Sequence, residues 1–418
     1  MENKQEVYLN IDDPLLIDES VEKYENFEYM PQTLANLNQQ GSIISITVNN
    51  KDAWYHLNQS YLFLKGKLVK NDDTVYADGD MISITNNGIV GLFSRAELMI
   101  NNQIIESVGS PLQASTLTKL MQKNPCDNDL AQLWSLDTTA AAAAANTGFA
   151  LRHNYLINNL AGNNKGCFTA MIPLKDIFGF VENYDKVLYG MQLDLKLNRT
   201  GNDDAIFKIN TVTDAGKIIV ERISWIIPHV SPSLIAQNNL YSIIQNESRI
   251  NAGFMARQSE STPVNQTSKF DWNLVVASGN QKPRYIIVGF QTGRSGNQDA
   301  NAACFDQCNL KNAFITLNGI RYPNMDVNNN YATNEVTILY EMYVKTQKQL
   351  YGSDSVPIPL ELFILNYPLL VFDVSKQPER MQCEFHANVA VDTRAYALIL
   401  SDKIVSFQSD GSKMNILF

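Results

Sequence analysis

The sequence has 418 residues, 45% of them hydrophobic and 18% charged, which is typical of a globular protein of about two to four domains. Its net charge of −10 argues against a coat protein that neutralises single-stranded RNA with a basic arm. Five scattered cysteines indicate reduced thiols of a cytosolic or nuclear setting rather than a disulfide framework.

The first 40 residues predict an extended acidic N-terminal arm. Residues 1–28 hold nine acidic side chains against Lys4 and Lys23, so they carry −7 of the net charge. The arm lacks the apolar core of a signal peptide, and no run in the chain reaches the length of a membrane-spanning helix. Because ordering such an arm costs backbone entropy, we expect residues 1–40 to lie on a partner surface.

Residues 41–230 show mainly strand patterns. The stretch YLFLKGKLVK places Leu62, Leu64 and Leu68 on one face and lysines on the other, and Asp78-Gly79 is a hairpin-turn signal. The clearest further period-two patterns are SIISITV (42–48), MQLDLKLN (191–198) and KIIVERISWII (217–227).

Two segments of this first half differ from the strand pattern. Residues 111–137 have helical spacing of leucines. The tract Ala140–Ala145 is compatible with a helix, but its Thr, Asn and Gly neighbours make a variable surface loop equally compatible.

Residues 231–262 are interpreted as a connector. Ser231 is a candidate N-cap with Pro232 at the first helical position, and Leu234, Leu240 and Ile244 form a weak helical stripe.

Residues 263–418 again predict strands, with helical signal nearly absent. Many short strands without alternating helices favour a β-sandwich or barrel over a parallel α/β fold. The predicted strands are RYIIVGFQT, AFITLNGIRYP, VTILYEMYVK, LLVFDV, CEFHANVAV, and the pair YALIL and KIVSF.

A short internal repeat relates the two halves. Ala96–Ile105 (AELMINNQII) and Ala313–Pro323 (AFITLNGIRYP) both read Ala, any residue, aliphatic, any residue, aliphatic, Asn, then Asn or Gly, with an offset of 217 residues. The offset is close to half the chain length, so two similar sandwiches in tandem are the simplest account. The fold class is therefore predicted as all-β.

The residues suggest no catalytic or metal site. The phosphate-loop, dinucleotide, zinc-protease and nucleophile-elbow motifs are absent from the sequence. Cys304 and Cys308 are the best metal candidates, but zinc needs a second ligand pair, which the sequence lacks. The four histidines, His56, His153, His229 and His386, are scattered and predicted to be structural. We therefore expect no enzyme activity, metal or cofactor, and weak or absent direct binding of nucleic acid.

Four segments of the second half look familiar together and in this order: PRYIIVGFQTG (283–293), FDQCNLKNAFITLNGIRYP (305–323), LYEMYVKTQKQLYG (339–352) and NYPLLVFDVSKQ (366–377). This run closely resembles the major capsid proteins of the polinton and adintovirus type. Those capsid proteins belong to double-stranded DNA viruses and virus-derived transposons and share a lineage with those of virophages and adenoviruses. Segments of the first half, including VERISWIIPHVSPS, are similar to the same family.

The resemblance implies two jelly rolls, 41–230 and 263–418, in a chain that forms a homotrimer. Six jelly rolls per trimer would make a pseudo-hexagonal capsomer that tiles an icosahedral shell around double-stranded DNA. Asn101-Asn102 and Asn318-Gly319 would be corresponding hairpin tips. The arm would contact a neighbouring capsomer or a minor capsid or penton protein. The expected location is the virion, after assembly in the host cytoplasm or nucleus.

Two alternatives stay open. A carbohydrate-binding or glycan-hydrolysing tandem jelly-roll protein would need a converging carboxylate pair or an exposed aromatic platform, whereas the four Trp residues lie in patterns that suggest core. A capsid gene domesticated in a host genome is the second alternative.

Overall fold

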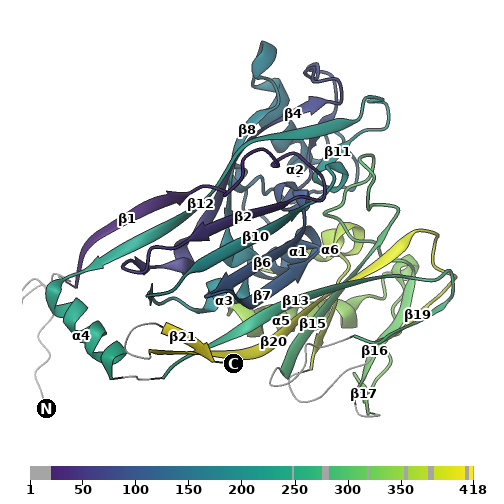
Figure 1. Ribbon diagram of the computed structural model, residues 1–418. Helices are drawn as coiled ribbons and strands as arrows, with labels where there is room; N and C mark the ends of the chain where they lie inside the picture. Colours follow the sequence, from purple (N-terminus) through teal and green to yellow (C-terminus); the bar gives the residue numbers. More distant parts are fainter. Residues whose placement is uncertain are drawn as a thin grey trace, which may run out of the picture.

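The computed structural model describes residues 20–246, 249–274, 282–317, 320–352, 356–374, 381–409 and 414–417. Two β-sandwiches follow one another along the chain, and helix α4 (Leu234–Gln245) joins them at one end (Figure 1). The predicted all-β fold with two tandem jelly rolls and short helices in the loops and connector is confirmed.

The first sandwich consists of two main sheets and a small ribbon. Its inner strand positions alternate as predicted, since Leu62, Leu64 and Leu68 of β4 are all buried. One sheet has the order β1 (Val21–Tyr29), β12 (Gly216–Pro232), β4 (Tyr61–Lys70) and β8 (Cys167–Pro173), and β3 (Trp54–Tyr55) and β9 (Leu188–Tyr189) extend it beyond the end of β4. The other sheet has the order β2 (Ile43–Val48), β10 (Leu193–Arg199), β6 (Phe93–Ile100) and β7 (Gln103–Gly109). In the small ribbon, β5 (Ile82–Ile84) pairs with β11 (Ile206–Lys208).

The second sandwich repeats this arrangement. Its two sheets take strands from the same relative places along the chain, so β13 corresponds to β1, β20 to β12 and β16–β17 to β6–β7. One sheet has the order β13 (Ile250–Pro263), β20 (Thr393–Ser409), β15 (Lys282–Thr292) and β18 (Leu370–Asp373), with β21 (Met414–Leu417) on β20; the other has the order β14 (Lys269–Trp272), β19 (Met381–Phe385), β16 (Leu310–Leu317) and β17 (Ile320–Tyr322).

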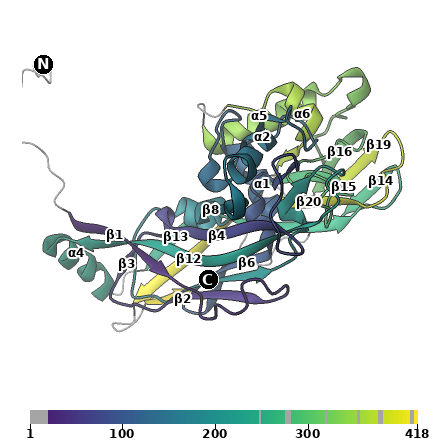
Figure 2. The ribbon, with the colours of Figure 1, turned by 90° about the horizontal axis from the view of Figure 1, so that it is seen from above.

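Most helices gather on one side of the two sandwiches, away from α4 (Figure 2). Helix α1 lies at the junction of the halves and contacts both β20 and α5, which explains why nearly all its residues are buried. Besides α4, the helices are α1 (Pro111–Gln122), α2 (Thr147–His153), α3 (Gly179–Asn183), α5 (Thr337–Tyr351) and α6 (Leu360–Asn366).

The N-terminal segment differs from the predicted arm. Residues 1–19 lie outside the described part of the chain, but Val21–Tyr29 forms β1, which is hydrogen-bonded to β12 from Pro232 to Trp225. This part of the arm therefore lies on β12 of the same chain, the longest strand of the first sandwich. The loss of backbone entropy on ordering residues 21–29 is offset by their hydrogen bonds to β12, which could not be predicted from the local sequence.

The range 231–262, predicted as the connector, contains a helix and the greater part of a strand. Helix α4 lies within that range, but β13 begins at Ile250 and pairs with β20 along its whole length. The helix is capped by Ser233, whose side chain accepts a hydrogen bond from the Ala236 amide, so the predicted N-cap at Ser231 is wrong. Pro232 ends β12 instead, because a proline is tolerated at the end of a strand.

Helix α5 differs most from the prediction, because its sequence VTILYEMYVK was expected to form a strand. Its β-branched and aromatic residues have high strand propensity. The buried positions, however, are Leu339, Tyr343, Thr346 and Gln347, which lie on one face of a helix and not of a strand. Packing against β18 therefore outweighs local propensity.

Smaller differences concern strand continuity and loops. YALIL and KIVSF are parts of one strand, β20, rather than a pair. The turn at Asp78-Gly79 joins β4 to β5, which belong to different sheets, so it closes no hairpin. Ala140–Ala145 forms an irregular loop. One buried apolar cluster runs through both sandwiches, so the two halves share a continuous core.

Candidate functional site

The two sandwiches meet where β7 and α3 of the first approach β13 of the second. Glu106 of β7 is buried there, and its Oε1 accepts hydrogen bonds from the amides of Gly179 at 3.0 Å and Arg257 at 2.6 Å. Its Oε2 accepts from the Phe180 amide at 3.0 Å. Burial raises the pKa of Glu106, and these backbone bonds and the Arg257 charge oppose the rise. One carboxylate thus ties three backbone segments together.

Arg257 of β13 completes this contact from the second half. Its Nη2 donates to Glu182 Oε2 at 2.6 Å and its Nη1 donates to the Lys175 carbonyl at 2.7 Å, both in the first half. The backbones also touch, because a Cβ at Gly179 would lie 1.9 Å from the Met255 carbonyl oxygen. Only glycine allows this approach.

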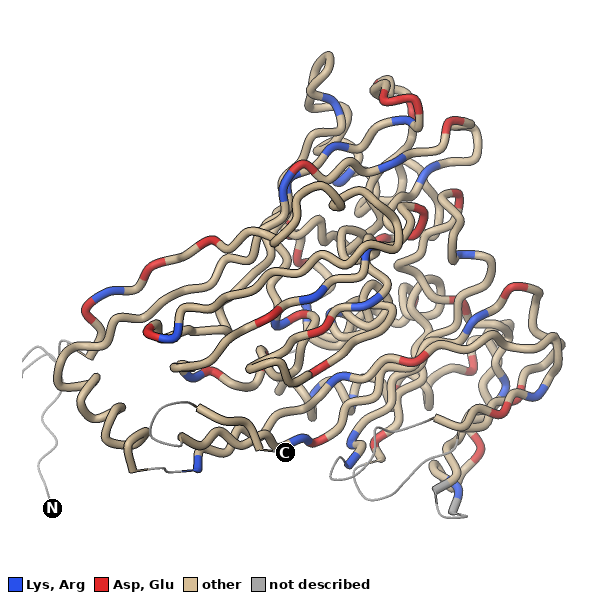
Figure 3. Tube along the Cα trace, in the orientation of Figure 1, with Lys and Arg blue, Asp and Glu red and all other residues tan. Residues whose placement is uncertain are grey.

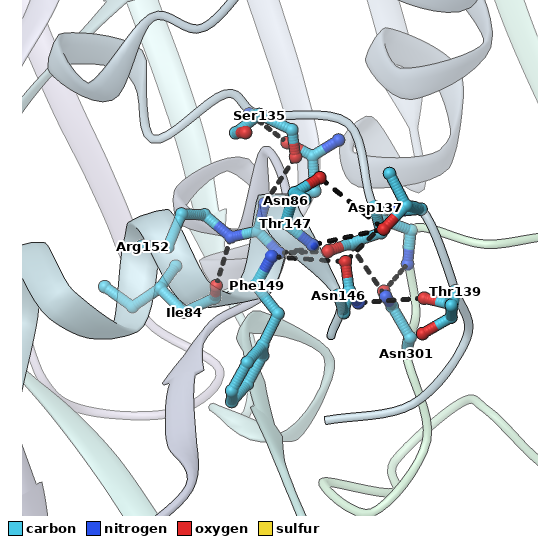
Figure 4. Close-up of polar contacts among 12 residues, drawn as sticks. Ile84, Asn86, Ser135, Asp137, Thr139, Asn146, Thr147, Phe149, Arg152 and Asn301 are labelled. Carbon is cyan, nitrogen blue, oxygen red and sulfur yellow. Dashed lines mark hydrogen bonds and ion pairs between the residues drawn. The ribbon is translucent and has the colours of Figure 1, made fainter. Parts of the chain in front are cut away.

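A second junction is a buried ion pair behind α2 (Figure 4). Arg152 of α2 donates from Nη2 to both carboxylate oxygens of Asp137, at 2.8 and 3.0 Å, and neither side chain is exposed. Its Nε donates to the Ile84 carbonyl at 3.0 Å, and its Nη1 donates to the Ser135 carbonyl. A buried charge pair needs such additional bonds to offset its loss of hydration.

Residues of the second half close this ion pair. Asn301 donates to Asp137 Oδ2 at 2.8 Å, and Asn366 donates to the Asp137 carbonyl at 2.9 Å. The Tyr367 hydroxyl lies 3.1 Å from the Asp137 amide and 3.2 Å from its carbonyl, and burial raises the pKa of Tyr367 well above its usual value. The cluster therefore fixes the second sandwich against the first.

The same region holds the loop that contains Ala140–Ala145. Asn146 is buried, and its Nδ2 donates to the carbonyls of Thr139 at 2.8 Å and Ala141 at 3.0 Å. Its Oδ1 accepts from the amides of Thr138 at 3.1 Å and Phe149 at 3.4 Å, so it also caps α2. This one side chain satisfies the backbone of an otherwise irregular loop.

The first predicted hairpin tip is tied to the second half. Asn101 and Asn102 have positive φ, as a two-residue turn between β6 and β7 requires. Asn101 Oδ1 accepts from the Gln192 amide at 2.9 Å, and its Nδ2 donates to the Met414 carbonyl at 2.6 Å.

The second predicted tip, Asn318-Gly319, lies outside the described residues. The flanking strands pair Leu317 with Ile320 at the end of β16 and β17. In the first half Ile100 pairs with Gln103 in the same way, 217 residues earlier. The equivalence of the two tips nevertheless stays a prediction.

Each of the four histidines has a hydrogen-bond partner within the chain. His56 contacts the Tyr24 hydroxyl and Asp185, and His229 contacts the Tyr29 hydroxyl. His153 contacts the Ile82 carbonyl, and His386 contacts the Asn329 carbonyl.

Of the two cysteines that were the best metal candidates, Cys304 is buried and Cys308 is partly buried. Burial raises the pKa of Cys304 to about 12 and that of Cys308 to about 11, so both are protonated near neutral pH. Within the described ranges, no three His, Cys, Asp or Glu side chains are grouped as metal ligands. The helices of the described part include none long and apolar enough to cross a bilayer.

Charged residues of both signs are interspersed over both sandwiches (Figure 3). Many of the basic side chains are paired with acids, as in Lys208–Asp299, Arg294–Asp306 and Arg284–Asp402. This arrangement differs from the clustered basic stripe typical of nucleic-acid-binding surfaces.

Comparisons with known proteins agree with the fold of two tandem β-sandwiches. A family model described as the double jelly roll-like domain matches residues 129–405. No curated protein matches the sequence. Among solved structures, the mavirus major capsid protein is similar with a TM-score of 0.57 and 11% identity, covering 100% of this chain and 94% of its own.

Two further solved structures have the same fold. The VP54 protein of PBCV-1 has a TM-score of 0.56 and 8% identity, covering 97% of this chain and 99% of its own. The Faustovirus major capsid protein has a TM-score of 0.53 and 8% identity, covering 99% of this chain and 94% of its own. Since the family model spans more than half of the sequence, the chain belongs to the double jelly roll-like domain family.

Proposed function

We propose that this chain is a viral major capsid protein that forms homotrimers with a pseudo-hexagonal outline. The trimers would tile an icosahedral shell around a double-stranded DNA genome. The resemblance to the polinton and adintovirus type specifies the kind of virus or integrated element. The proposed location is the virion, with assembly in the host cytoplasm or nucleus.

The observation that carries this proposal is the repetition of one sandwich twice in a rigid chain. Both halves have the same strand order, and they are joined by a continuous core and by the buried contacts of Glu106 and Asp137. Two similar, rigidly joined units per chain give a trimer six similar units, which supports a pseudo-hexagonal building block. The solved capsid proteins of mavirus and Faustovirus share this fold.

The direct test is the mass of the purified full-length protein. We expect size-exclusion chromatography with light scattering to give about three times the chain mass of 46.9 kDa, and electron microscopy to show hexagonal particles or shells. A stable monomer under all assembly conditions would refute the proposal.

Direct contact with DNA is proposed to be weak or mediated by other proteins. The net charge of −10 opposes counterion release from DNA, which requires clustered Lys and Arg. Filter binding of the purified protein should therefore show little retention of DNA at physiological salt. Tight binding that weakens steeply with salt would contradict this part of the proposal.

The part of the N-terminal arm beyond β1 is proposed to reach a neighbouring capsomer or a minor capsid or penton protein. Deleting residues 1–19 leaves β1 in place and should therefore permit trimers but impair shells. Shells of normal yield and stability from this deletion would exclude that role.

The carbohydrate alternative receives no support from the aromatic residues. Trp54, Trp134, Trp225 and Trp272 are all buried, so none of them offers the exposed platform on which a sugar ring stacks. Glycan-array binding by a monomeric protein would restore this alternative.

A further inference from the structure

Strand β13 is the outermost strand of its sheet, and the first sandwich covers its free edge. The Met255 amide donates to Asn183 Oδ1 at 2.9 Å, and the Arg257 amide donates to Glu106 Oε1 at 2.6 Å. The Met255 carbonyl lies against Gly179. As a result Phe254 is only 5% exposed, and the edge is not available for pairing.

Strand β1 has the corresponding position in the first sandwich but lacks such cover. Every residue from Val21 to Glu28 is exposed. Phe27 stacks on His229 at a centroid distance of 4.0 Å, yet 43% of its surface is exposed, and Tyr24 and Met30 are similarly accessible. An edge strand with exposed apolar side chains is a surface that proteins usually cover.

The second sandwich offers a surface that corresponds to the one beneath β13. Inside the chain β13 contacts β7, and β17 takes the place of β7 in the second half. Beside β17 lies an open, mainly apolar groove of about 400 Å³, here called the β17–α5 groove. It is lined by Tyr322 at the end of β17 and by Pro323 and Met325 after it, by Ile338 and Met342 of α5, and by Val371 of β18.

Basic side chains lie near the groove and acidic side chains on β1. Strand β1 carries Glu22, Glu25 and Glu28 against the single Lys23. Helix α5 carries Lys345, which lines the groove, and Lys348 outside the lining, whereas the acidic residues of the groove are Glu341 of α5 and Asp373 of β18. Among the described residues, neither Glu22 nor the two α5 lysines has an ion-pair partner within 4.0 Å. The two unpaired lysines of α5 therefore favour an acidic strand over a basic one on this side of the groove.

We infer that β1 of one copy docks in the β17–α5 groove of the next copy and so forms the seam between subunits. This contact repeats between chains the packing of β13 on β7 within the chain. It rests on the proposed trimer, because each copy then uses its β1 once and its groove once. Such a head-to-tail contact closes into a ring when the rotation per subunit fits, and three copies leave neither surface uncovered.

The first test places a charge in the groove. Met325 and Ile338 are 57% and 37% exposed, so the double variant M325E/I338E should fold like the wild type. It replaces two apolar side chains of the groove, which β1 would contact, by charged ones. We expect at least a tenfold weaker association, measured by light scattering over a dilution series. The matched control is Leu365→Glu on α6, which is 67% exposed and outside the groove, and which should leave the trimer intact.

The second test locates β1 directly. A photoreactive benzoylphenylalanine at position 27 of the full-length chain should crosslink to residues 322–349, and mass spectrometry of mixed heavy and light protein should assign that crosslink to two different copies. Because Phe27 stacks on His229, crosslinks to residue 229 of the same chain are expected in either case. Crosslinks that never join two copies, that reach the chain's own N-terminal residues, or that reach another face of a neighbour would overturn the inference.

The two tests separate the seam from the trimer itself. A wild-type protein that is monomeric would refute the proposed function. A trimeric wild type whose M325E/I338E variant associates equally well, with crosslinks outside the groove, would refute only the seam.

Discussion

The carboxylate of Asp137 accepts two hydrogen bonds from Arg152, at 2.8 and 3.0 Å, and Asn301 from the other half of the chain donates a third at 2.8 Å. Asp137 and Asn301 are 164 residues apart in sequence. The ion pair belongs to the first sandwich, but its remaining bonding capacity is used by the second. It therefore acts as a fixed point between the two jelly rolls rather than as a chemical site.

Replacing Asp137 by Asn should strongly destabilise the protein. The amide keeps the shape of the side chain but leaves the Arg152 charge buried without a counter-ion, a change that costs about 3–5 kcal/mol. Chemical denaturation should show a correspondingly lower free energy of unfolding. The control is Asp214→Asn, which breaks the more exposed pair with Lys70 and should change the free energy little. Similar effects of both variants would contradict the role given to Asp137.

Substitution of Gly179 by Ala should weaken the contact between the sandwiches. The added Cβ would lie 1.9 Å from the Met255 carbonyl oxygen, so the backbone of α3 or β13 must shift, at a cost of about 1–3 kcal/mol. Thermal unfolding should show the loss as a lower melting temperature. In β13 itself, Gly253 has no atom within 4 Å of an added Cβ, so Gly253→Ala serves as the matched control. An unchanged melting temperature of the Gly179→Ala variant would show that the backbones of α3 and β13 are not in such close contact.

Asn146→Ala should destabilise the loop that contains Ala140–Ala145. The variant loses the α2 cap, which is worth about 0.5–2 kcal/mol, and leaves the carbonyls of Thr139 and Ala141 without their donor. Limited proteolysis should cleave this loop faster in the variant. Ala144→Ser, at an exposed position of the same loop, should be cleaved at the wild-type rate.

The packing of β1 should depend on pH through His229. Burial lowers the pKa of His229 below its usual value of 6.5, so the unfolded chain binds this proton more readily than the folded chain. The contribution of neutral His229 to the stability of the fold is therefore fully present above pH 6.5. It is lost as the pH falls from 6.5 to the lower pKa that His229 has in the folded protein.

The measurement for His229 is the free energy of unfolding at pH 7.5 and pH 5.5, in the wild type and in His229→Phe. The wild type should lose more stability than the variant over this interval. Equal losses would assign the pH response to other groups.

Local sequence patterns predicted those strands in which one face is buried. In β2 and along most of β4 the buried and more exposed positions alternate, so the period of two is visible in the sequence itself. The two-residue turn at Asn101-Asn102 was also predictable, because few residues other than Asn and Gly adopt positive φ at low cost. The absence of catalytic motifs from the sequence and its acidic charge were the basis for predicting neither enzyme activity nor strong binding of nucleic acid.

Features that depend on distant partners were not predictable in this way. β1 has no alternating burial, since only its hydrogen bonds to β12 make it a strand. α5 has strand-like composition, and its helix is stabilised by packing against β18 and by the bond from Tyr343 to the Leu120 carbonyl, 223 residues away. Neither partner is visible in the local sequence.

The sequence by itself thus determined the fold class, the tandem organisation and the resemblance to capsid proteins, because these follow from periodicity and ordered motifs along the chain. The tertiary structure alone decided how the halves are joined. The contacts of Glu106 with Arg257 and of Asp137 with Asn301 connect residues 151 and 164 positions apart. Each of these polar residues would look like an ordinary surface residue until its partner is brought to it, since only a partner makes the burial of a charge favourable.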